Sequence, residues 1–250
     1  MSPLTFYIVY HKILHEENTK YFSDEFKNST LMWVAVNEEI EKEYPPWINN
    51  RLLKEWEMPQ HSPMYQMLHW QQNSFFHHLY NNRSIISTKY VGFGQYDQRL
   101  DANQFQTLVN LLENDTADKL VGCYMTPFMA ILDLLKEEEW QRIFLDNYNK
   151  FYHLSLKLEE FKDKPMLLLH TFIIPTWFFN HMMPFIEFIT PIIVRHLKWN
   201  IRHFAGTMER VYAMCLAAGM IEGKFRSVHG FAGVIQCDSQ RTPDPIRGLQ

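Results

Sequence analysis

The chain has little of what marks several common classes of protein. Its 24 basic and 28 acidic residues leave a net charge of −4, without the basic excess that neutralises nucleic-acid phosphates. We therefore expect no nucleic-acid partner. Its three cysteines, Cys123, Cys215 and Cys237, are odd in number and far apart, without metal-ligand spacing. This favours a reduced, intracellular setting over a disulfide framework.

Several catalytic signatures are absent as well. Gly92 and Gly94 lack the third glycine of a dinucleotide fingerprint, and no phosphate loop of the Gly-Lys-Ser/Thr type occurs. No Gly-x-Ser-x-Gly elbow supports a serine hydrolase. His77 and His78 are neighbours on a predicted helix, where adjacent side chains diverge by about 100°. They therefore do not share a face as a metal-binding pair would.

The sequence also lacks a clear membrane segment. Residues 1–10 have no basic region or small-residue cleavage site, so we expect no secretory signal. The long apolar stretch Ile173–Val194 contains Pro175, Pro184 and Pro191 and the charged Glu187. Prolines break helices and a charge in a bilayer is costly, so we interpret it as a buried strand followed by an amphipathic helix. Peripheral membrane contact through its aromatic residues is left open.

What is present is an alternation of strand-like and helix-like segments. With 250 residues, 46% hydrophobic and 21% charged, the chain suffices for one large α/β domain. The predicted strands are Phe6–Tyr10, Leu31–Val36, Tyr90–Gly94, Leu120–Tyr124, Met166–Ile174 and Phe225–Ile235. The predicted helices cover 63–80 and 101–112, start again at Thr126-Pro127, cover 140–161, and run from an N-cap at Thr207 to a stop at Gly219.

Strands that alternate with helices favour a mostly parallel central sheet flanked by helices. We therefore predict a single Rossmann-like α/β domain over residues 1–236. The stretch between Asn37 and Gln60 is charged and broken by prolines, so it is predicted to be mostly loop. Residues 237–250 are polar and interrupted by prolines, and we predict a tail there.

Two of the predicted strands end in groups suited to anions or metals. Phe6–Tyr10 runs into His11-Lys12, and Tyr90–Gly94 runs into Gln95-Tyr96-Asp97. In open α/β sheets, ligands bind just beyond the carboxyl ends of the strands. One end that bears a cation and one that bears a carboxylate suit a metal-bound diphosphate, which points to a nucleotide-sugar enzyme.

Three segments in this order resemble a glycosyltransferase family: Tyr7–Lys12, the helix Pro63–Tyr80 and Tyr90–Asp97. The family includes bacterial capsular-polysaccharide enzymes and glycosyltransferases encoded by large DNA viruses of algae, the chloroviruses. Met208–Tyr212 also resembles the family's Glu-Arg-hydrophobic helix start. Bacterial members commonly carry His-Tyr-Arg-Arg where this chain has Gln95–Arg99, which is closer to the viral type. No complete Asp-x-Asp pair is present.

The resemblance implies a GT-A fold and transfer of a sugar from a UDP- or GDP-sugar donor to a hydroxyl of a glycan or glycoprotein acceptor. It also implies a divalent metal, Mn²⁺ or Mg²⁺, and a cytoplasmic location, in the host if the protein is virus-encoded. The rival interpretation is a non-catalytic protein that binds glycans or a partner on a degenerate transferase fold. The sequence leaves open the oligomeric state and whether transfer inverts or retains the anomeric configuration.

The metal would stabilise the charge that the leaving diphosphate gains. Mn²⁺ and Mg²⁺ prefer hard oxygen ligands, so Asp97 at its strand end is the predicted catalytic metal ligand. The alternative is a surface aspartate that makes a turn hydrogen bond. By resemblance to GT-A enzymes, which often complete the site with a C-terminal histidine, His229 is the predicted second ligand. A structural role is its alternative, and His170 and His203 are weaker candidates.

Donor binding and proton transfer need further side chains. Inverting transfer needs a general base for the acceptor hydroxyl, and Glu209 is the candidate. Its alternatives are a favourable place in the first turn of a helix or an ion pair with Arg210. Tyr65 with Gln66 opens a helix, where backbone N–H groups favour anions, although capping explains them as well. The predicted donor-binding residues are Tyr10, His11, Lys12, Tyr65 and Gln95, with a core position for Tyr10 and a solvated strand end for His11-Lys12 as alternatives.

Overall fold

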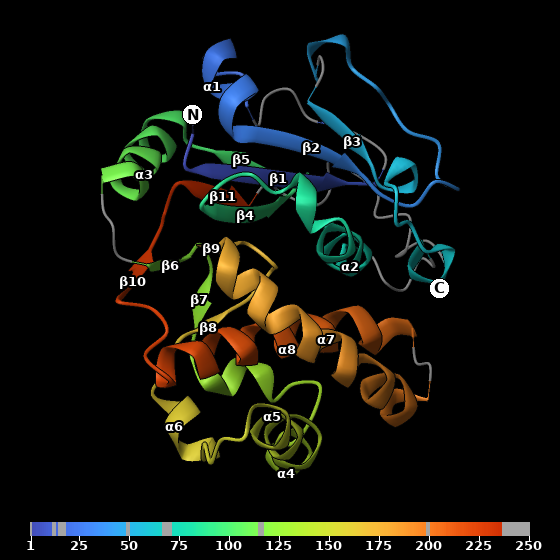
Figure 1. The fold of residues 1–250 in the computed structure, drawn as a ribbon, viewed down its shortest axis with the longest axis vertical. Helices are drawn as coiled ribbons and strands as arrows, with labels where there is room; N and C mark the ends of the chain where they lie inside the picture. The colour runs from blue at the N-terminus through green and yellow to red at the C-terminus, as the bar shows by residue number, and fades with distance from the viewer. Residues whose placement is uncertain are drawn as a thin grey trace.

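A central sheet of seven strands organises the part of the chain that the structure, a computed structural model, describes: residues 2–11, 14, 19–48, 51–66, 72–114, 118–198 and 201–236 (Figure 1). Only β9 runs antiparallel to its neighbours, and the other adjacent strands pair in parallel. This confirms the predicted α/β class with a mostly parallel sheet. The strand order is β10 (Ser227–Gly230), β6 (Lys119–Gly122), β9 (Phe172–Pro175), β4 (Tyr90–Gln95), β1 (Leu4–Tyr10), β2 (Leu31–Ala35) and β3 (Leu52–Lys54).

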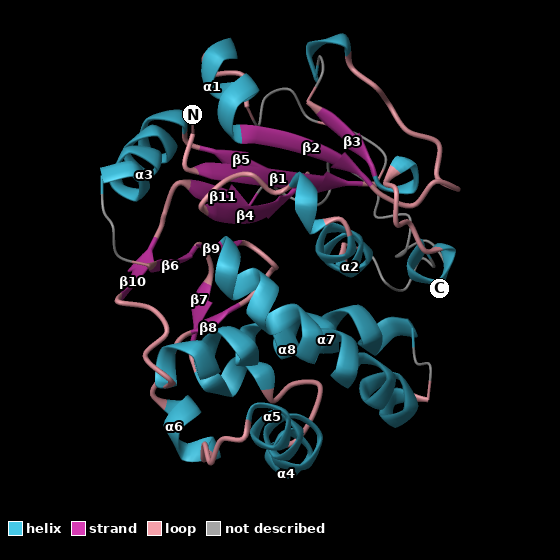
Figure 2. Ribbon diagram, in the orientation of Figure 1, coloured by secondary structure: helices cyan, strands magenta, loops and turns pink. Residues whose placement is uncertain are grey.

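Helices cover both faces of this sheet (Figure 2). One face packs against α1 (Asp24–Thr30) and α3 (Ala102–Asn114), and the other against α2 (Asn73–Asn81), α7 (Thr176–Leu197) and α8 (Ile201–Ile221). An outer group beyond α7 and α8 consists of α4 (Glu137–Trp140), a π-helical turn at Gln141–Leu145, α5 (Asp146–Tyr152) and α6 (Leu158–Lys162). Two small antiparallel pairs complete the description: β5 (Gln98–Leu100) with β11 (Val234–Gln236), and β7 (Met125–Thr126) with β8 (Met166–Leu167).

The start of α3 shows how local sequence specifies an element. The Oδ1 atom of Asp101 accepts a hydrogen bond from the backbone N–H of Gln104 at 2.9 Å, which satisfies a donor at the open helix end. The buried side chains then recur at helical spacing, so that α3 lays one apolar stripe on the sheet. These are the four residues that the sequence predicted: Phe105, Leu108, Val109 and Leu112.

The two glycines of β4, Gly92 and Gly94, leave room for the ring of Phe6. Phe6 on β1 lies opposite Gly92 in the parallel register, and its ring crosses both Gly92 and Gly94. A Cβ atom at Gly94 would lie 2.8 Å from two atoms of that ring. Any side chain at these positions would therefore displace Phe6, which is fully buried.

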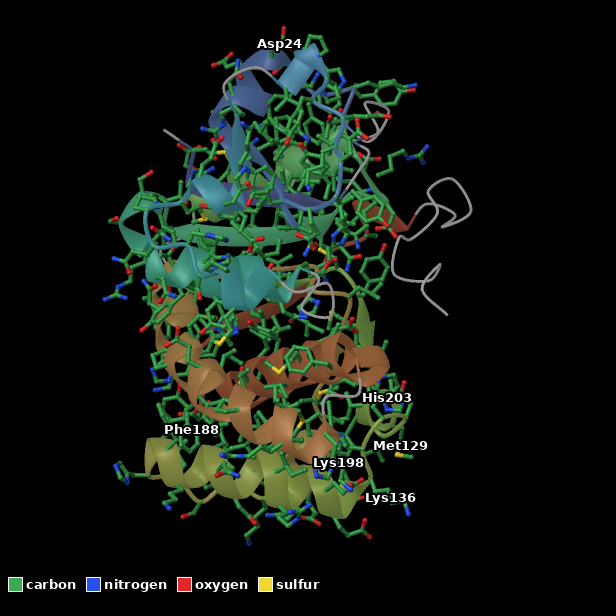
Figure 3. All side chains as sticks on the ribbon, turned by 90° about the vertical axis from the view of Figure 1, so that its right-hand side faces the viewer. Asp24, Met129, Lys136, Phe188, Lys198 and His203 are labelled. Atoms are coloured by element: carbon green, nitrogen blue, oxygen red, sulfur yellow. The ribbon has the colours of Figure 1, made fainter. Side chains whose placement is uncertain are left out.

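Helix α7 is the apolar element beneath the sheet. It is long and apolar enough to cross a membrane by length and composition, but 56% of its most apolar window is buried inside the fold. Its buried side chains pack in an aromatic-rich layer between the sheet and the outer helices, while Phe188 faces outward (Figure 3). Together with β9 it confirms the predicted strand and amphipathic helix over Ile173–Val194.

The last helix differs from its prediction. Thr207 is not an N-cap, because α8 begins at Ile201 and the Thr207 side chain is buried inside it. Gly219 is not a stop either. The ring of Phe178 on α7 packs against it, with a ring carbon 2.6 Å from where a Cβ would stand. The helix ends at Ile221, shortly before Gly223, whose φ of +68° suits glycine.

Several other predicted elements are divided. The predicted strand Met166–Ile174 is two strands, β8 and β9, because Leu169 and His170 between them have φ of 60° and 47°. The stretch 37–60, which was predicted to be mostly loop, contains the short strand β3. The predicted helix 63–80 is a 3-10 turn at Pro63–Gln66 followed by α2, with 67–71 outside the described residues.

Two further elements are shorter than predicted. The helix expected after Thr126-Pro127 is a 3-10 turn at Phe128–Ile131. The predicted last strand, Phe225–Ile235, is divided between β10 and β11. The predicted tail from Cys237 on lies outside the described residues.

Replacing Gly92 by alanine tests the packing of Phe6. The new methyl group would overlap the Phe6 ring and lie 2.8 Å from Cγ1 of Ile173, so we expect a loss of about 1–3 kcal/mol in unfolding free energy. Chemical denaturation measures this loss. Gly230→Ala on β10 is the matched control, since its nearest neighbour, Sδ of Met125, is 3.6 Å away. An equal loss in both variants would contradict the role given to Gly92.

Candidate functional site

The carboxyl edge of the parallel strands holds two of the five predicted donor-binding residues, His11 and Gln95. Val9 near the end of β1 lies opposite Gln95 at the end of β4, and the N–H of Tyr96 donates to the Val9 carbonyl at 3.0 Å. Nδ1 of His11, just past β1, is 2.9 Å from Oδ1 of Asn37, just past β2. His11 is therefore part of a buried polar contact rather than a solvated strand end.

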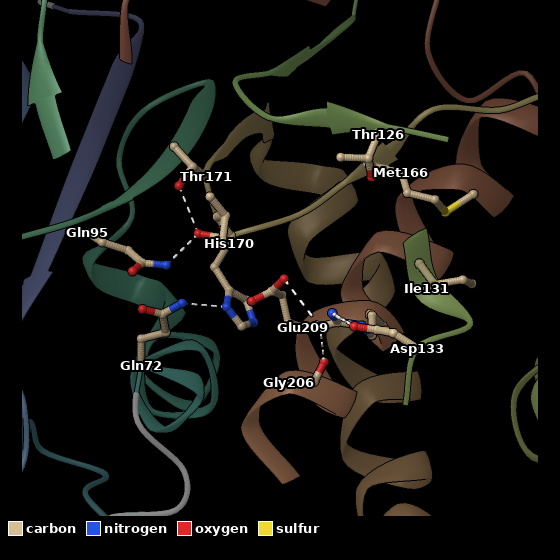
Figure 4. A network of polar contacts seen from close by, with 12 residues as sticks. Gln72, Gln95, Thr126, Ile131, Asp133, Met166, His170, Thr171, Gly206 and Glu209 are labelled. Atoms are coloured by element: carbon tan, nitrogen blue, oxygen red, sulfur yellow. Dashed lines mark hydrogen bonds and ion pairs between the residues drawn. The ribbon is translucent and has the colours of Figure 1, made fainter. Parts of the chain in front are cut away.

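A tight reversal between β8 and β9 borders the same edge (Figure 4). The Leu169 carbonyl accepts hydrogen bonds from Nε2 of Gln95 at 2.7 Å and from Oγ1 of Thr171 at 2.8 Å. Thr171 also pairs with the side chain of Gln98 at 2.8 Å. These contacts hold Leu169 and His170 at positive φ, a conformation that costs free energy in residues other than glycine and clusters at functional sites.

Glu209 meets this reversal from α8. The backbone N–H of Leu169 donates to its carboxylate, whose side chain is only 16% exposed. Burial raises the pKa of Glu209, and the Leu169 amide and the Arg210 guanidinium oppose that rise. A carboxyl group that binds a proton more readily than an exposed one is a better match to general-base work near neutral pH. One main-chain residue thus joins the predicted donor-binding Gln95 to the predicted base Glu209.

Of the two structural alternatives for Glu209, the structure contradicts the first-turn position and contains the ion pair with Arg210. Glu209 does not occupy a first helical turn, because α8 begins at Ile201. An ion pair with Arg210 is present, with Nη1 of Arg210 3.6 Å from its carboxylate. Arg210 nevertheless makes its hydrogen bonds elsewhere, to both carboxylate oxygens of Asp133 at 2.9 and 2.8 Å and to the Gly206 carbonyl at 2.9 Å.

The two predicted metal ligands lie on different parts of the sheet. Asp97 is half-buried in the turn that joins β4 to β5, directly beyond the carboxyl edge. His229 lies on β10, with Nε2 3.0 Å from Oγ of Ser227, and lines a cavity of about 340 Å³ between β10 and α3. Asp97 does not line that cavity. Within the described ranges no three His, Cys, Asp or Glu side chains cluster as metal ligands would.

The remaining predicted site residues are more scattered. Tyr10 is fully buried in the core on the α3 side, the position named as its alternative. Tyr65 is half-buried in a 3-10 turn, its ring stacked on His77 with centroids 4.7 Å apart. Burial raises the pKa of the Tyr65 hydroxyl. Lys12 lies outside the described residues. His203 is exposed on α8, on the outer surface (Figure 3).

Sequence reasoning missed a second buried polar pair near this edge. Oε1 of Glu55, which follows β3, lies 2.6 Å from Nδ1 of His78 on α2, and neither side chain is exposed. The backbone N–H of Ser62 faces the other ring nitrogen of His78 at 2.9 Å. No local pattern separates Glu55 from the exposed acidic residues around it, so only the fold identifies this contact. Sequence reasoning also missed Leu169, because its main chain, not its side chain, contacts Gln95 and Glu209.

No protein-family model and no curated protein matches the chain. Among solved structures, the apo structure of WbbM, a bifunctional glycosyltransferase, is similar in fold, with a TM-score of 0.59 at 11% sequence identity. The match covers 94% of this chain but 45% of that one, so the chain spans less than half the length of WbbM. The predicted α/β fold with a mostly parallel sheet is therefore shared with part of a known glycosyltransferase structure.

Proposed function

We propose that the protein is a glycosyltransferase that moves a sugar from a nucleotide-diphosphate donor, a UDP- or GDP-sugar, to a hydroxyl of a glycan or glycoprotein. The observation that carries this proposal is the Glu209 carboxylate at the carboxyl edge of the sheet. It is held there by the N–H of Leu169, whose carbonyl binds Gln95. The fold similarity to a glycosyltransferase structure supports it.

In this proposal Glu209 is the general base. Its carboxylate removes the proton of the acceptor hydroxyl while the bond between the sugar and the diphosphate breaks. Partial burial keeps water from the carboxylate and raises its pKa, which makes it a stronger base than an exposed glutamate. Because Arg210 is held by Asp133, it stays beside Glu209 without forming a close pair that would weaken the base.

The donor would lie across the ends of β1 and β4. Asp97, beyond the end of β4, offers the single carboxylate with which a Mg²⁺ or Mn²⁺ site can start, since such ions take their other ligands from phosphates and water. When bound, the ion would neutralise charge on the leaving diphosphate. His11 and Gln95 would orient the donor at the same edge. Lys12 and Tyr65 as donor contacts and a cytoplasmic location are further parts of this proposal. The proposal leaves out His229, because β10 lies three strands from β4 and one ion cannot bind both side chains, and Tyr10, because it is buried in the core.

A thermal-shift screen with UDP, GDP, CDP and their sugars, with and without Mn²⁺, tests donor binding. We expect one nucleotide to raise the melting temperature in a metal-dependent manner, because a ligand that binds only the folded state stabilises it. The shift should be lost in Asp97→Ala and kept in Asp163→Ala, an exposed aspartate beside α6. No shift with any nucleotide in a folded sample would favour the non-catalytic binding protein.

Glu209→Gln tests the base. With the donor found in that screen, we expect nucleotide release to fall about 10²–10⁴-fold while the thermal shift with the nucleotide remains. A base works when deprotonated, so activity should decline as pH falls through the raised pKa of Glu209, at a higher pH than for an ordinary carboxyl group. Glu159→Gln on the surface of α6 is the control. Full activity in Glu209→Gln would remove Glu209 from the mechanism.

A further inference from the structure

His170 is a buried histidine inside the reversal that holds Glu209. It is 3% exposed and lies between the rings of Phe76 on α2 and Tyr212 on α8, both with centroids 5.3 Å away. Its φ of 47°, next to the positive φ of Leu169, fixes the direction of its side chain. The imidazole is therefore placed rigidly by the fold rather than free to turn toward solvent.

The hydrogen bond to Gln72 defines where the imidazole carries its proton. The side-chain nitrogen of Gln72 faces Nδ1 of His170, and an amide nitrogen can only donate. Nδ1 therefore accepts, and the proton resides on Nε2. Burial and the nearby Arg210 guanidinium lower the pKa of His170 to about 3, so the ring is neutral near physiological pH.

The Nε2 atom of His170 is buried and has no hydrogen-bond partner among the described residues. Figure 4 draws His170 and Glu209 in one group of polar residues, and the N–H of the residue before His170, Leu169, already donates to the Glu209 carboxylate. A buried N–H donor without a partner costs free energy, so a site that keeps one is expected to use it. The neighbouring carboxylate is the acceptor that suits it.

We propose that His170 is a positioning residue for Glu209: a small shift of the Glu209 side chain brings its carboxylate to the Nε2–H, which donates to it and orients the free oxygen toward the acceptor hydroxyl. This inference rests on the proposed role of Glu209 as general base. The charged and titratable groups around the carboxylate are then Arg210 on α8, Asp133 beside α8, and His170 and Tyr212. The Tyr212 hydroxyl is directed to Sδ of Met183, so the neutral donor left for the carboxylate is Nε2–H of His170, which can hold the carboxylate without neutralising its charge.

The test compares two amides at position 170. Asparagine tolerates positive φ and can reach the place of Nδ1, but it is too short to replace the Nε2 donor. Glutamine reaches the place of Nε2. Carbon-13 NMR of protein labelled at the glutamate carboxyl carbon, with Glu209→Gln for assignment, follows the titration of Glu209 directly. The pH profile of donor turnover follows it through activity.

We expect H170N to raise the pKa of Glu209, since the carboxylate loses a donor, and to move the acidic limb of the activity profile in the same direction. Its kcat should fall about tenfold or more with little change in KM, and H170Q should restore part of both effects. An unchanged titration of Glu209 in folded H170N would overturn the inference. A changed titration in a protein that turns over no donor would overturn the proposed function alone.

Discussion

The rest of the site depends on the hydrogen bonds made by the main chain of Leu169. Its carbonyl accepts from Gln95 on β4 and from Thr171, and its N–H donates to Glu209 on α8. The same residue begins the reversal that lets β9 enter the sheet antiparallel between β4 and β6. The strained reversal therefore lets β9 join the sheet in the antiparallel direction, and it also connects α8 to the carboxyl edge of the sheet.

The layers of the fold explain why this segment stays in place. Phe76 on α2 and Tyr212 on α8 enclose His170, and Phe172 on β9 packs against Phe76. Positive φ at two residues that are not glycine persists only where surrounding packing and hydrogen bonds determine it. Dense apolar burial on this face has a second effect, because it removes water from Glu209 and His170 and shifts their pKa values in opposite directions.

The two faces of the sheet have different characters. On the α3 face, Phe6 crosses the glycines of β4 and packs against Phe105, which makes that side a continuous core. On the α8 face, the core is interrupted at the carboxyl edge by Glu209, His170 and Gln72. Polar groups gathered at one edge of an otherwise apolar layer are the usual arrangement for a ligand site in an open α/β sheet.

The sequence by itself determined the elements whose information is local. The alternation of apolar runs predicted the α/β class, β1, β2 and β4, and the capped helix α3 with its four buried residues, because hydrophobic spacing and capping act over a few residues. Local signals misplaced the start of α8 and joined β8 to β9, since burial of Thr207 and the contacts of Leu169 come from distant segments. Only the tertiary structure decided that Gln95, His170 and Glu209, which lie far apart in the chain, meet at one edge. Their contact depends on strand order and on main-chain hydrogen bonds, which no side-chain pattern encodes.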